Sequence, residues 1–156
     1  MARLSTLSYG GTAAIVTGMG LVVAFDAGTS SRAALVSSLL VIAIADNLAD
    51  SLAIHVYQES ENLPSRRAFR STVANYMTRL MVAGSFAILA LLTPAHSLVP
   101  VVLGWGMALL CTLTYFVARA RGVAPGLEVL KHLAVAILVI LVSRVIGAWI
   151  VTRTSL

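Results

Sequence analysis

The sequence has few charged residues, and this scarcity excludes a water-soluble fold. Only 11% of the 156 residues are charged, and the mean hydropathy is +0.95. A soluble domain carries about 25% charged residues, so this chain has too little polar material to cover a surface in water. The single cysteine, Cys111, excludes an intrachain disulfide. We therefore expect an integral membrane protein.

The sequence also lacks the motifs of catalysis. It contains no recognisable nucleophile–base pair, no phosphate-binding loop and no cofactor motif, which argues against an enzyme and against a tightly bound cofactor. The formal net charge of +5 would suggest a nucleic-acid partner in a soluble protein. Here the basic residues lie between apolar segments, so they indicate membrane topology, and no nucleic acid is expected.

Five apolar segments are long enough to cross a bilayer as helices, which need about 20 residues each. The expected spans are residues 10–25, 33–57, 73–93, 99–118 and 128–151. Backbone groups in lipid must be satisfied within each segment, and the alternation of a barrel strand is absent. The sequence predicts an all-α, polytopic protein in which residues 1–156 form one five-helix domain. The first segment is taken as a span and not a signal peptide, because no small-residue cleavage site follows it.

Basic residues are distributed unevenly between the two ends of these spans, with two basic connections expected over 64–71 and 119–126. One set of flanks carries Arg3, Arg66, Arg67, Arg70, Arg119, Arg121 and Lys131, and the other carries Arg32 and Arg153. The positive-inside rule predicts a cytoplasmic N-terminus and an external C-terminus. A prokaryotic plasma (inner) membrane is the expected location.

The few acids are concentrated in the stretch IADNLADSLAIHVYQESE, residues 44–61, which holds four of the six. The polar residues that share one face of this helix, within about 140°, are Asp46, Asn47, Asp50, Ser51, Tyr57 and Gln58, with His55 at the edge and Glu59 just past it. A charge at the bilayer centre costs ~3 kcal/mol or more. The face must therefore meet the bundle interior, a partner subunit or a water-filled path.

A structural interpretation pairs these acids with arginine. Asp50 and Arg79 both lie ~10 Å deep when counted at 1.5 Å per residue, so they can meet. Arg144 lies nearer the outer face, where it can snorkel. No basic residue is expected at the depth of Asp46.

A functional interpretation makes the same face an ion path. Asp46, Asp50, Asn47 and His55 within the membrane, with Glu59 at the mouth, suit Fe²⁺, Mn²⁺ or Zn²⁺ better than Na⁺. Two acids can also titrate when a cation leaves, which is how a metal/proton exchanger works. The spacing itself is not specific for one metal.

Several segments resemble the vacuolar iron transporter family. The ending HVYQESE of the second span, YGGTAAIVTGMGLVVAF in the first, ANYMTRLMVAGSFAILALLTP in the third and LEVLKHLAVAILVILVSRVIGAWI in the last carry the resemblance. It implies a homodimeric bundle that exchanges Fe²⁺ or Mn²⁺ for protons along a path at the dimer interface. By position, Asp46 stands where the family has its second-helix glutamate, and Glu59 and Glu61 lie at the cytoplasmic mouth.

The chain departs from that family in three places. Ala13 and Ala14 replace an Asp-Gly pair of the first helix, and the cytoplasmic metal-binding domain between the second and third helices is missing. Asp50 and Arg79 are additions. The resemblance thus implies a divergent, minimal member.

Three functions follow as hypotheses. The first is a dimeric, proton-coupled transporter of a divalent metal ion. The second is a non-transporting membrane scaffold or accessory protein in which Asp50 and Arg79 form a structural ion pair. The third is a proton-coupled carrier of a small organic cation.

Overall fold

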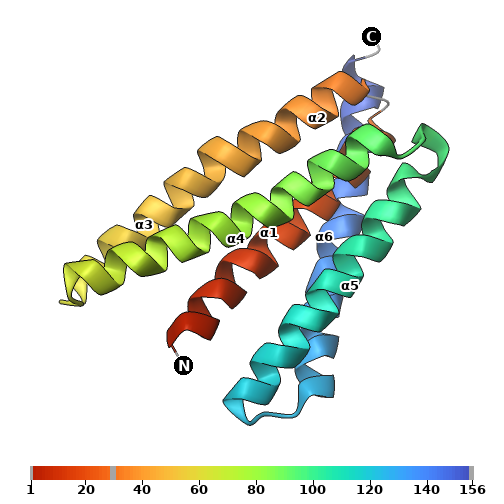
Figure 1. Cartoon of the computed structure of the whole chain (residues 1–156). Helices are drawn as coiled ribbons and strands as arrows, with labels where there is room; N and C mark the ends of the chain where they lie inside the picture. The colour runs from red at the N-terminus through yellow and green to blue at the C-terminus, as the bar shows by residue number, and fades with distance from the viewer. Residues whose placement is uncertain (1, 29–30, 155–156) are drawn as a thin grey trace.

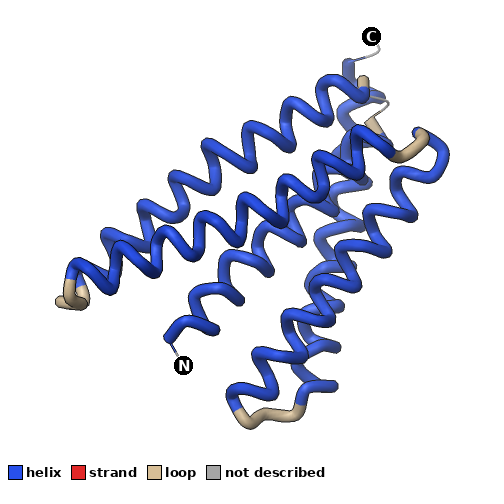
Figure 2. Tube along the Cα trace, in the orientation of Figure 1, coloured by secondary structure: helices blue, strands red, loops and turns tan. Residues whose placement is uncertain are grey.

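The computed structural model describes residues 2–28 and 31–154, with side chains for residues 10–28 and 31–153. The elements are α1 (Ala2–Ala27), α2 (Arg32–Val41), the π-helix η1 (Ile42–Asp46), α3 (Asn47–Ser60), α4 (Ser65–Leu92), α5 (Ala95–Arg121) and α6 (Pro125–Thr154). Figure 2 shows short loops between long helices. Because α2, η1 and α3 form one continuous rod (Figure 1), the described residues provide five helices that can cross a membrane. The expected all-α membrane protein is confirmed.

The helices extend beyond the expected spans. Residues 64–71 were expected as a connection, but α4 already begins at Ser65, so Arg66, Arg67 and Arg70 lie on its first turns. Pro64 ends the preceding turn in an extended conformation, with φ −55° and ψ 126°. Arginine is a good helix former, and nothing in this stretch interrupts the helix once it has begun.

Helix α1 lies at the centre of the bundle. It packs against α4, α5 and α6, and more briefly against α2, whereas its described residues make no close backbone contact with α3. In Figure 1 the α3–α4 and α5–α6 hairpins diverge toward the end of the bundle at which α1 begins. The two chain ends lie at opposite ends of the bundle, as an odd number of spans requires.

Close helix contacts around α1 depend on glycine, as the Gly-rich first span predicts. A Cβ on Gly18 would lie 2.7 Å from the Phe86 ring, and one on Gly147 would meet the backbone carbonyl of Ala24. Met19 is fully buried against Gly106, so its thioether fills the core between α1 and α5. These contacts fix how closely α4, α5 and α6 approach the central helix.

Arg32 ties the start of α2 to the end of α4. Its Nε donates to the carbonyl of Ala90 at 2.6 Å, and its Nη2 donates to Leu91 at 2.8 Å and also to Thr93. The last carbonyls of a helix have no partner within the helix and carry partial negative charge, so a guanidinium satisfies them well. This contact gives Arg32 a structural role on the flank that carries few basic residues.

We expect Arg32→Gln to lower the free energy of unfolding by about 2 kcal/mol, because hydrogen bonds from a charged donor are lost. The control is Arg153→Gln, which removes the same charge from an exposed residue in the last turn of α6 and should change stability by less than about 0.5 kcal/mol. Reversible unfolding in detergent, followed by circular dichroism, measures both. Equal effects would contradict a capping role for Arg32.

Candidate functional site

Asp46 lies at the middle of the rod that α2, η1 and α3 form. The rod formed by α2, η1 and α3 runs from Arg32 to Ser60, so Asp46 is ~21 Å from either end at 1.5 Å per residue. The hydrocarbon core of a bilayer is about 30 Å thick. The carboxylate of Asp46 is therefore placed near the membrane centre, and η1 ends at this residue.

The side chain of Asn47 supplies a hydrogen bond that the backbone of the π-helix lacks. The backbone N–H of Asn47 bonds to the carbonyls of Ile42 and Ile44 and skips that of Ala43. The Asn47 side-chain amide donates to the Ala43 carbonyl instead, at 3.1 Å. Asn47 is fully buried, so this bond satisfies a backbone group that would otherwise lack its helical partner in an apolar setting. With this bond formed, the side-chain oxygen Oδ1 of Asn47 points toward α4.

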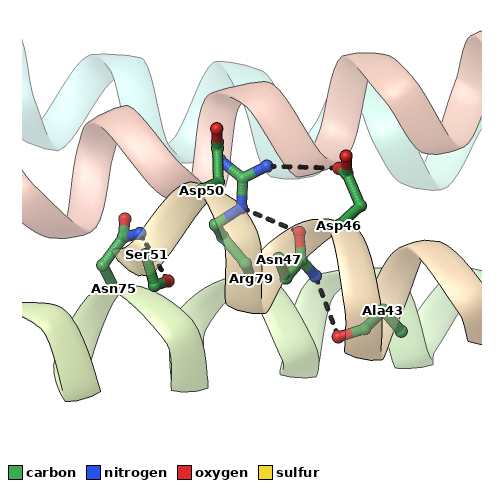
Figure 3. A network of polar contacts seen from close by, with 7 residues as sticks. All are labelled: Ala43, Asp46, Asn47, Asp50, Ser51, Asn75 and Arg79. Carbon is green, nitrogen blue, oxygen red and sulfur yellow. Dashed lines mark hydrogen bonds and ion pairs between the residues drawn. The ribbon is translucent and has the colours of Figure 1, made fainter. Parts of the chain in front are cut away.

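The guanidinium of Arg79 on α4 contacts three polar side chains of this rod (Figure 3). Its Nε donates to Asn47 Oδ1 at 2.8 Å, its Nη1 forms a close ion pair with Asp50 Oδ2, and its Nη2 lies 3.8 Å from Asp46 Oδ2. The Arg79 side chain is only 5% exposed, whereas those of Asp46 and Asp50 are 61% and 48% exposed. The cation is thus buried, and the two anions lie at the edge of the single chain.

The expectation that Asp46 has no basic residue at its depth is wrong. Asp46 and Asp50 are one helical turn apart on the same face, and the N–H donors of a guanidinium point outward in its plane from three nitrogens. One arginine therefore reaches both carboxylates. The shorter contact is with Asp50, so the two acids are not equivalent.

A second polar contact lies one turn along α4. Asn75 Nδ2 donates to Ser51 Oγ at 3.1 Å, and both residues are fully buried. A Cβ on Gly10 of α1 would overlap Asn75 Oδ1 and lie 3.0 Å from Arg79 Cγ. Gly10 therefore leaves the space that Asn75 and the stem of Arg79 occupy.

The remaining predicted ligands lie nearer the α3–α4 loop. His55 Nε2 is 3.3 Å from Glu59 Oε1, and the His55 ring meets Phe69 edge-on with centroids 6.5 Å apart. The predicted metal set is thus divided: Asp46, Asn47 and Asp50 surround Arg79, while His55 and Glu59 pair with each other. Within residues 2–28 and 31–154, no three His, Cys, Asp or Glu side chains are grouped to hold a metal.

Sequence reasoning missed three parts of this site: Gly10, Asn75 and the π-helix. Asn75 could have been found, because it lies four residues before Arg79 and so shares its face of the third span. The sequence presents Gly10 only as one of four glycines between residues 10 and 20. The residues of the π-helix, Ile42–Asp46, carry no sequence pattern that predicts one.

The fold and site define an integral membrane protein with a buried arginine shared by two carboxylates at mid-span. No family model matches the chain, and no curated protein and no solved structure matches it either. The resemblance to vacuolar iron transporters therefore stays a prediction.

We expect Gly10→Ala to destabilise the fold by about 1–3 kcal/mol, because the new methyl group forces Asn75 and the Arg79 stem to move. Gly84→Ala on α4 is the matched control, since a Cβ there meets nothing within 4 Å. Removing a helical glycine at an open position should be neutral or stabilising by up to ~1 kcal/mol. Unfolding in detergent compares the two variants, and a neutral Gly10→Ala would show that this contact does not constrain the site.

Proposed function

We propose that this protein is a membrane carrier that exchanges a cation for protons at Asp46 and Asp50. The supporting observation is a charge imbalance at mid-span: two carboxylates share one guanidinium, and the second carboxylate is largely exposed. An uncompensated charge is costly at the bilayer centre, so such a carboxylate is expected to take a proton or a cation. We propose Fe²⁺ or Mn²⁺ as cargo, in keeping with the family resemblance and with oxygen ligands.

A second copy of the chain is part of this proposal. Asp46 and Asp50 lie at an exposed edge, beside the exposed Ala49 and Ala53, each three residues along the helix from one of them. Lipid does not solvate a carboxylate, so this edge has to be covered by protein or reached by water. A homodimer in the plasma membrane that brings two such edges together would supply four aspartates to one cation path. His55 and Glu59, nearer the α3–α4 loop, would serve at the mouth of that path.

One observation favours a second candidate, a non-transporting scaffold or accessory protein. Asp50 is already engaged in a close ion pair with Arg79, and the described chain groups no three metal-ligating side chains. In this case the pair would serve only to hold α3 against α4. Breaking a buried pair by removing one partner costs about 3–5 kcal/mol, less where one partner is half exposed.

Calorimetry with Fe²⁺, Mn²⁺, Zn²⁺ and Mg²⁺ on the purified protein in detergent tests the carrier. We expect saturable binding by the wild type, weakened at least about tenfold in Asp46→Asn because a charged oxygen ligand is lost. Asp26→Asn makes the same change at an exposed residue in the last turn of α1 and should bind as the wild type does. Absence of binding by any of these cations, in a folded wild type, would contradict metal as the cargo.

The scaffold is tested at Asp50 and by the effect of metal on stability. Asp50→Asn should destabilise the protein by about 1–3 kcal/mol with or without metal, because Arg79 loses its closest counter-ion. Exchanging the charges, Asp50→Arg with Arg79→Asp, should restore part of that loss if the pair acts only through its charge. Thermal unfolding with and without Mn²⁺ measures these effects. A stabilising shift by Mn²⁺ that requires Asp46 would reject the scaffold.

A further inference from the structure

The contact between the rod and α4 differs in chemistry between its two halves. From η1 toward the α3–α4 loop, polar side chains pair across the helices: Asn47 with Arg79, Ser51 with Asn75, and Gln58 with Ser71 at 2.9 Å. These pairs cover ~16 Å along the rod from Asn47 to Gln58, at 1.5 Å per residue. We call this row of three pairs the polar seam.

On the other side of η1, the buried residues of the two helices are apolar as far as the Arg32 contact at the end of α4. From η1 toward the α4–α5 loop, the buried residues of the two helices are Leu35, Leu39, Ala43, Ala83, Phe86, Ala87 and Ala90. Phe86, Leu39 and Ala90 are at most 1% exposed. Apolar interiors packed in this way exclude water.

Several polar atoms at the polar seam are buried without a hydrogen-bond partner. They are Asn75 Oδ1, Gln58 Oε1 and the neighbouring His55 Nδ1. Asn75 as a whole is fully buried. Buried polar atoms nearly always have a partner, and where protein supplies none, ordered water does. Three such atoms therefore indicate water at the polar seam, with Asn75 Oδ1 on the side that faces Gly10 of α1.

We propose that the polar seam is a hydrated half-path that connects the α3–α4 end of the bundle to Arg79 and Asp50, and that the apolar half closes the opposite side. Water in this path would deliver protons to the carboxylates from one side only. The side is the one that the positive-inside rule assigns to the cytoplasm. The use of the path for exchange depends on the proposed function, whereas its hydration depends only on the seam.

Cysteine accessibility tests this directly on the full chain, in a Cys111→Ala background. Ser51→Cys lies in the polar seam and Ala90→Cys in the apolar half, and both residues are fully buried. A membrane-impermeant methanethiosulfonate reacts with thiolates, which form only where water reaches. In vesicles of known orientation, we expect Ser51→Cys to react at least about tenfold faster than Ala90→Cys, and only from the α3–α4 side.

Equal, slow labelling of both thiols would overturn the proposal, and so would labelling of Ser51→Cys from the α4–α5 side. If Ser51→Cys does not fold, Ser71→Cys, at the outer pair of the seam, is compared with Ala87→Cys in the same assay. Because labelling requires no cargo, loss of metal binding would count against the proposed carrier and leave the half-path standing.

The unmodified protein provides an independent measurement. The side-chain amide protons of Asn75 and Asn47 should exchange with water within seconds in nanodiscs, as read by water-to-amide magnetisation transfer in NMR. Protection of the Asn75 amide for hours would show a dry seam and overturn the proposal.

Discussion

The contact between α4 and the rod depends on the buried guanidinium of Arg79. A buried charge is tolerated only with partners and hydrogen bonds, and Arg79 obtains them from one neighbouring helix. The rod contains a π-helix at this level. Asn47 donates from its side-chain amide to the Ala43 carbonyl that the π-helix skips, and its Oδ1 accepts a hydrogen bond from Arg79. Gly10 of α1 leaves room for the stem of the arginine. The rod and α1 therefore both make room for, or bind, this one side chain of α4.

The two carboxylates differ in how closely they contact Arg79 and in how exposed they are. Asp50 makes the close contact and Asp46 the longer one, and Asp46 is also the more exposed of the two. On this account Asp50 serves mainly to hold the cation of α4 in place. In the proposed carrier, Asp46 would be the acid that binds a proton or a cation, and the proposed water at the polar seam would serve that exchange.

Composition and spacing predicted the five helices, because the length of an apolar segment and the lack of polar surface leave few alternatives in lipid. The meeting of Asp50 and Arg79 followed from depth alone. What could not be predicted was the reach of Arg79 to Asp46, which depends on side-chain geometry between two helices. The π-helix was also missed, because it depends on how one asparagine bonds to its own backbone. The separation of His55 from the aspartates reflects its position at the edge of the polar face.

A double-mutant cycle tests the division between the two acids most directly. Arg79→Gln is combined with Asp50→Asn and, separately, with Asp46→Asn, and unfolding of all variants is measured in the same detergent. The account predicts a coupling of about 2 kcal/mol between Arg79 and Asp50, and less than about 1 kcal/mol between Arg79 and the more exposed Asp46. A coupling to Asp46 equal to or larger than that to Asp50 would contradict it, because Asp46 would then be the structural counter-ion.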